Sequence, residues 1–187
     1  VVAHCLRFIG NISYSTGDSG SAQRHFRESL EIMKEIDNSL GQAFALNNLG
    51  ALELDNLNLG EARSKFTAAI EIFRDMGEYW AIPKALGNIG TTYSMEGEYE
   101  RGSEITRASL ETARNPNLEY EGNAWDIANG LLSLSWYYRH IESDLERSVK
   151  MLDEVLEICV GEDDIGNTIT NVHLQMARVR IDQEKFD

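Results

Sequence analysis

The chain has 187 residues, of which 42% are hydrophobic, and its formal net charge is −14. An acidic surface repels phosphate backbones, so this composition argues against nucleic-acid binding. No apolar run approaches the roughly 18 to 20 residues that cross a bilayer, and we expect no membrane-spanning segment.

The first 40 residues predict a pair of helices. Leu6, Ile9 and Gly10 fall on one helical face, and a second run with helical spacing contains Ala22 and Phe26. The polar, glycine-containing segment 16–19 separates the two runs and predicts a turn. We therefore expect a helical hairpin over residues 1–40.

The same pattern recurs at a spacing of 40 residues. Gly10, Gly50 and Gly90 follow one another at this interval, and Phe66 keeps the register of Phe26. A single hairpin cannot bury its own apolar face, so neighbouring hairpins must stack and share a continuous core. We expect the second and third hairpins over residues 41–80 and 81–121.

A fourth copy follows a longer loop that contains Pro116. It carries Leu131, Leu134 and Tyr138 at the same relative positions and covers residues 122–164. Residues 165–187 predict the start of a fifth hairpin. The expectation is one all-α solenoid of about four and a half hairpins over residues 1–187, within a larger polypeptide.

The Leu-Gly-x-x-Tyr, Ala and Phe positions of these copies resemble the tetratricopeptide repeat. The resemblance covers essentially the whole chain and implies a right-handed α-α superhelix that binds proteins. The period of 40 exceeds the usual one of about 34, and the proline that closes the second helix is absent. We expect the extra residues to lengthen the second helix. The long repeat resembles kinesin light chains, Leu-Gly-Asn-repeat scaffolds and bacterial maltose-activator-type regulators.

Signatures of catalysis and of bound metal are missing from the sequence. The four histidines form no metal-spaced pair, and no phosphate-binding, dinucleotide-binding or nucleophile-elbow motif is present. Recurring glutamates such as Glu31 and Glu71 occupy the same position in successive copies, which favours a structural role. The distant cysteines Cys5 and Cys159 indicate reduced thiols. We expect a cytoplasmic protein that is not an enzyme and needs neither a cofactor nor a metal.

In the tetratricopeptide family, five positions of each first helix line the concave groove. Transferred by register, these positions carry no aspartate or glutamate, although the chain has 31 acidic residues. The predicted groove is therefore basic, rich in amides and partly aromatic. Trp80 and Trp125 are assigned to the stacking of hairpins. The candidate peptide-binding residues are Arg7, Asn11, Phe44, Asn47, Asn48, Lys84, Asn88, Asn129, Trp136, Arg139, Asn171 and Arg178.

This groove favours a protein or peptide partner that carries acidic or carboxylate groups. The leading interpretation is a non-catalytic binding scaffold within a larger signalling or regulatory protein. Co-chaperone tetratricopeptide domains, which grip acidic C-terminal tails, offer a sharper comparison. Their five carboxylate-binding positions correspond to Arg7, Asn11, Asn48, Lys84 and Asn88, of which Asn88 replaces a basic residue.

Two other interpretations stay open. The resemblance to bacterial regulators implies a small-molecule sensor domain of a transcription regulator. Alternatively, the incomplete C-terminal hairpin exposes apolar surface through which two copies of the chain could associate.

Overall fold

A computed structural model describes residues 1–115, 117, 123–159, 172–173, 175–176 and 178–179. Within these residues the helices form four hairpins, each made of two consecutive helices joined by a short turn. The helices are α1 (Val2–Ser15), α2 (Ser19–Glu35), α3 (Ser39–Asp55), α4 (Leu59–Met76), α5 (Ile82–Met95), α6 (Tyr99–Ala113), α7 (Asn123–His140) and α8 (Leu145–Cys159). A short 3-10 helix, η1 (Tyr79–Ala81), precedes α5.

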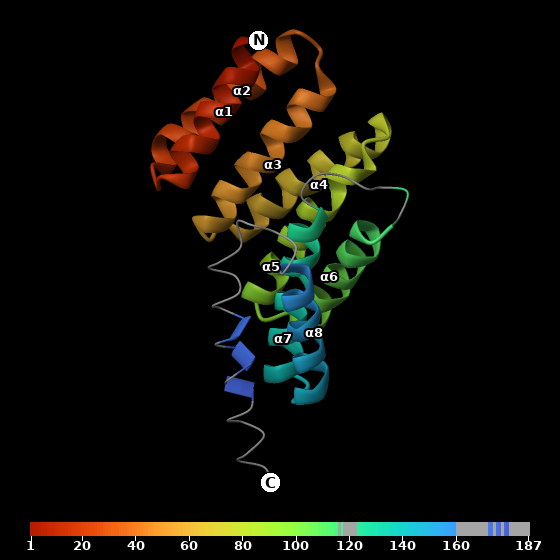
Figure 1. Cartoon of the computed structure of the whole chain (residues 1–187). Coiled ribbons are helices and arrows are strands. Elements are labelled where there is room, and N and C mark those ends of the chain that lie inside the picture. The colour runs from red at the N-terminus through yellow and green to blue at the C-terminus, as the bar shows by residue number, and fades with distance from the viewer. Residues whose placement is uncertain (116, 118–122, 160–171, 174, 177, 180–187) are drawn as a thin grey trace.

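The hairpins stack in chain order. The second helix of each hairpin packs against the first helix of the next, so that α2 contacts α3, α4 contacts α5 and α6 contacts α7. First helices also contact each other in succession, α1 with α3, α3 with α5 and α5 with α7. Figure 1 shows this progression from the N-terminal hairpin to α8. The predicted all-α solenoid is confirmed, and its first helices share one face.

The core runs through the stack in consecutive apolar clusters. Phe26 and Phe66, which are 40 residues apart, are both almost fully buried. The cluster around Phe26 includes Leu49 and Leu52 of α3, so residues of two hairpins build one core. Burying a side chain of this size stabilises the fold by about 1.5–3 kcal/mol relative to leaving it in water.

Close helix crossings explain the recurring glycines. A Cβ atom on Gly10 would lie 2.5 Å from the Phe26 ring, and one on Gly50 would lie 2.8 Å from the Phe66 ring. On Gly90 it would lie 2.9 Å from the carbonyl oxygen of Gly102. The expectation that small residues permit close approach of the two helices is confirmed.

The turns recur every 20 residues, which is half of the sequence period. Left-handed backbone occurs at five such positions, with φ values of 81°, 51°, 61°, 75° and 85° at Gly17, Asp37, Leu57, Gly77 and Gly97. The following residue begins the next helix, and in two cases its side chain caps that helix: Asp18 accepts from the Ser21 N–H at 3.0 Å and Asn38 from the Gly41 N–H at 2.8 Å. The length of the repeat is thus divided between both helices, and the prediction that only the second is lengthened is wrong.

The predicted fifth hairpin, over residues 165–187, lies largely outside the described residues. Within the described part, Val172 and Val179 are buried in the same cluster as residues of α7 and α8. Self-association through this segment stays a prediction. None of the helices in the described part of the chain is long and apolar enough to span a membrane.

Candidate functional site

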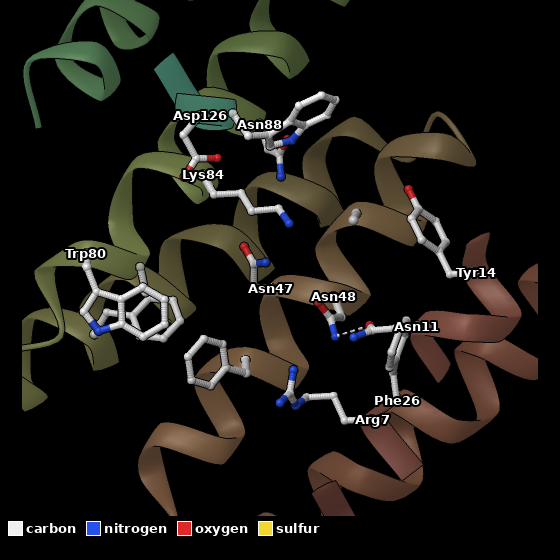
Figure 2. A pocket seen from close by; sticks show the side chains of 15 residues that line it. Arg7, Asn11, Tyr14, Phe26, Asn47, Asn48, Trp80, Lys84, Asn88 and Asp126 are labelled. Atoms are coloured by element: carbon white, nitrogen blue, oxygen red, sulfur yellow. Dashed lines mark hydrogen bonds between the residues drawn. The ribbon is translucent and has the colours of Figure 1, made fainter. Parts of the chain in front are cut away.

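The shared face of the first helices is hollowed by a cavity of about 520 Å³. Seven of the predicted groove residues line it, and they come from three different hairpins. They are Arg7 and Asn11 on α1, Phe44, Asn47 and Asn48 on α3, and Lys84 and Asn88 on α5. Figure 2 shows the labelled side chains around this space. The stacking of hairpins brings together residues that are up to 81 positions apart in the sequence (from Arg7 to Asn88).

The polar part of the wall presents two cations and several amides. The Asn48 side-chain N–H donates to the Asn11 side-chain oxygen at 3.0 Å, which links α1 to α3. Figure 2 shows Lys84 extending into the cavity, with its ammonium group toward Asn47 and Asn48. Among the described residues, neither Arg7 nor Lys84 forms an ion pair with a carboxylate. Both charges therefore remain available to an anionic ligand.

The apolar part of the wall is aromatic. The Phe44 ring lies 5.1 Å from that of Phe73 and 5.8 Å from that of Trp80, between ring centroids. The Arg7 guanidinium lies 5.3 Å from the Phe44 centroid, within range of a cation–π interaction. Trp80 thus packs on a neighbouring hairpin, as predicted, and also lines the cavity. Trp125 lines it too and is 49% exposed, so assigning these tryptophans to stacking alone was wrong.

A neighbouring cavity of about 250 Å³ continues the groove between α5 and α7. Lys84 and Asn88 line it on one side and the predicted residue Asn129 on the other. Asp126 lines both this cavity and the larger one, which corrects the prediction of a groove without acidic residues. The register rule missed Asp126 because it lies one turn before Asn129, in the first turn of α7.

Trp136 lies in a third cavity of about 490 Å³ and does not line the first. Its ring centroid lies 5.5 Å from that of Tyr99 and 4.8 Å from the ring of His140. Arg139 and Arg178 line none of these three cavities. Asn171 lies outside the described residues. The structure therefore gathers the N-terminal members of the predicted groove and leaves its C-terminal members apart from them.

Tyr14 closes one end of the large cavity. Burial, together with a hydrogen bond to the Asp55 carboxylate and the charge of that group, raises the pKa of Tyr14 to about 12. The phenol is therefore neutral at physiological pH. Asp55 is the acidic residue that the sequence places nearest to the groove positions.

The described residues hold no group of three or more His, Cys, Asp or Glu side chains arranged to bind a metal ion. The cavity walls offer cations, amides and aromatic rings. These groups recognise carboxylates and peptide main chain by hydrogen bonding, and apolar side chains by burial.

Comparison with known families supports this reading of the repeats. A family model described as "Tetratricopeptide repeat" matches residues 2–75. The chain is a tetratricopeptide-repeat protein. Members of this family serve in general as protein-interaction scaffolds.

Two curated proteins share part of the repeat region. Over 103 residues the chain is 28% identical to the heat shock protein sti1 homolog of Schizosaccharomyces pombe, covering 54% of this chain and 17% of that protein. Over 104 residues it is 31% identical to Protein NCA1 of Arabidopsis thaliana, covering 51% of this chain and 25% of that protein. The chain thus spans a quarter or less of the length of these relatives.

Among solved structures, the tetratricopeptide-like repeats of a kinesin light chain protein from Podospora anserina have the same architecture. The TM-score is 0.67 at 12% identity, and the match covers 97% of this chain and 87% of that one. At this identity the likeness shows the fold.

Proposed function

We propose that the chain is a non-catalytic module that binds a protein partner by holding an extended, carboxylate-bearing peptide in the groove of its first helices. The observation that carries this proposal is the convergence of Arg7, Asn11, Asn48, Lys84 and Asn88 on one cavity. Three hairpins contribute to the set, so the site exists only in the stacked solenoid. The module acts within a larger cytoplasmic protein with a signalling or regulatory role.

The chemistry of the wall suits a peptide. Arg7 and Lys84 donate charge-assisted hydrogen bonds to a carboxylate, and these are stronger than neutral ones. The Asn47 and Asn88 side chains are placed to donate to main-chain carbonyls and to accept from main-chain N–H groups. The aromatic wall around Phe44 accommodates an apolar side chain of the same ligand.

The five converging residues occupy the carboxylate-binding positions that the co-chaperone comparison identifies. A heat shock protein is among the relatives of the chain, which supports this comparison. Asn88 stands where a second basic residue is expected on the third hairpin. We therefore expect weaker binding of acidic tails than a full set of basic residues provides.

The test is capture of peptides from a library with free C-terminal carboxylates and from the same library amidated. Wild type is compared with the variant Arg7→Ala/Lys84→Ala and with Arg27→Ala/Arg74→Ala, which removes the same charge from exposed positions on α2 and α4. We expect the groove variant to lose at least about tenfold in affinity for free-carboxylate peptides, because each lost charged hydrogen bond costs about 1.5–3 kcal/mol. The control variant should bind as wild type does. Equal binding by both variants would overturn the proposal.

A second candidate is a small-molecule sensor, favoured by the size of the larger cavity. Its volume of about 520 Å³ lies within the usual range of ligand pockets, about 300–1,000 Å³. A ligand that binds only the folded state raises the melting temperature. A metabolite that stabilises wild type, and does so less in the Arg7→Ala/Lys84→Ala variant, would favour the sensor over the peptide module.

A further inference from the structure

The groove has opposite charges at its two ends. Arg7 lies at one end of the large cavity and Asp126 at the other, with Lys84 between them, as Figure 2 shows. Asp126 also lines the 250 Å³ cavity that continues the groove between α5 and α7. A ligand that follows the groove away from the Arg7 end therefore meets a carboxylate after it has passed the cations.

The surroundings of Asp126 are those of a site for an organic cation. Trp125 lines the same two cavities and is 49% exposed, so an indole ring is available beside the carboxylate. A carboxylate attracts an ammonium or guanidinium group by charge, and a tryptophan face attracts the same group by cation–π interaction. Asn129 and Ser133 complete the wall, and both side chains donate to carbonyl oxygens of their own helix at 3.0 Å.

We propose, resting on the proposed function, that the groove selects a peptide with a lysine or arginine shortly before its carboxylate, and that Asp126 and Trp125 hold this basic side chain. An acidic side chain at the same place is repelled by Asp126. The groove therefore discriminates against runs of acidic residues next to the carboxylate, although its Arg7 end binds an anion.

The dimensions of the groove give the spacing. Along α5 the smaller cavity extends from Lys84 to Thr91. Seven residues of helix rise by about 10 Å, which corresponds to about three residues of extended chain at about 3.3 Å each. The basic residue is thus expected two to four positions before the residue that carries the carboxylate.

Acetylated heptapeptides with a free C-terminus provide the test. One of the second to fourth positions before the C-terminal residue is fixed as Lys, Arg, Ala or Glu, and the other positions are mixed. Binding is measured for wild type, Asp126→Lys, Trp125→Ala and Glu146→Lys. Glu146 is exposed in the first turn of α8 and lines none of the three cavities, so the last variant matches the charge change and the helix-terminal location of Asp126→Lys.

Wild type and Glu146→Lys should retain Lys and Arg peptides over Glu peptides by about fivefold, a ratio reached by a charge pair at a partly exposed site. Asp126→Lys should reverse this order, and Trp125→Ala should weaken it without changing the requirement for a free carboxylate. If Asp126 only stabilises the N-terminus of α7, the Asp126→Lys variant melts at a lower temperature but keeps the wild-type order, and this overturns the inference.

The amidated versions of the same peptides separate the two proposals. A preference for free over amidated peptides, without any preference between Lys and Glu, overturns this inference and leaves the proposed function standing. Equal retention of free and amidated peptides overturns the proposed carboxylate site. A wild-type protein that retains none of the peptides counts against both.

Discussion

Gly90 lies where α5 crosses α6, and a Cβ atom there would be 2.9 Å from a backbone oxygen, that of Gly102. Side chains can rotate away from such an approach, but a helix backbone cannot move without shifting its whole hairpin. Gly50 faces the Phe66 ring instead, at 2.8 Å from a Cβ atom. These positions show why the sequence keeps small residues at a 40-residue spacing.

Gly90→Ala should destabilise the fold by about 1–3 kcal/mol, the usual cost of overpacking a close contact. Gly60→Ala is the matched control, because a Cβ atom on Gly60 would meet nothing within 4 Å. That control should be neutral or stabilise by up to about 1 kcal/mol through helix propensity. Urea denaturation of both variants measures the difference. A Gly90→Ala variant as stable as Gly60→Ala would show that α5 and α6 are not held as closely as the structure indicates.

At single residues, the groove was predictable where the register of the repeat holds. Arg7, Asn48 and Lys84 were found because equivalent positions of successive hairpins line one face. Asp126 escaped prediction because the register rule starts one turn later in α7. Trp80 escaped because it lies in η1, outside the first helices to which the rule applies.

At the scale of helices and turns, one position breaks the pattern that its equivalents follow. Leu57 has φ of 61°, while Gly17 and Gly97, which are 40 residues away on either side, have φ of 81° and 85°. A side chain in left-handed backbone costs about 1–2 kcal/mol, which glycine avoids. Leu57 is 66% exposed, so its side chain recovers little by burial.

Leu57→Gly should therefore raise the free energy of unfolding by about 0.5–1 kcal/mol, since the relief of strain exceeds the entropy that glycine adds to the unfolded chain. The reciprocal variant Gly97→Leu should lower it, because the same strain is introduced at an equivalent turn. Thermal melts of the two variants check the signs. A Leu57→Gly variant less stable than wild type would mean that the exposed leucine contributes more than its conformation costs.

The helices were predictable from the 40-residue period, but the 20-residue spacing of the turns was not. The five left-handed positions are occupied by Gly, Asp, Leu, Gly and Gly, so no single residue type marks them. What they share is backbone geometry together with the start of the next helix one or two residues later. The sequence shows side chains, and these are similar only between whole repeats.

At the scale of the whole molecule, the net charge of −14 describes the surface poorly where binding is proposed. The groove gathers Arg7 and Lys84 from hairpins that are not adjacent in sequence, on a chain with 31 acidic residues. Such sorting of charge attracts anionic segments of a partner and repels acidic proteins elsewhere. Composition alone predicts the repulsion, and only the stacked fold reveals the attraction.

The three tryptophans of the chain are reporters for where a ligand binds. Trp80 and Trp125 line the large cavity, whereas Trp136 lines a different one. The most direct test is a ¹H–¹⁵N NMR titration with a short free-carboxylate peptide selected from the library, with the indole signals assigned by Trp→Phe substitution. We expect the Trp80 and Trp125 signals to shift together and to saturate, while the Trp136 signal stays in place. A peptide that binds but moves only the Trp136 signal, or none of the three, would contradict the proposed groove.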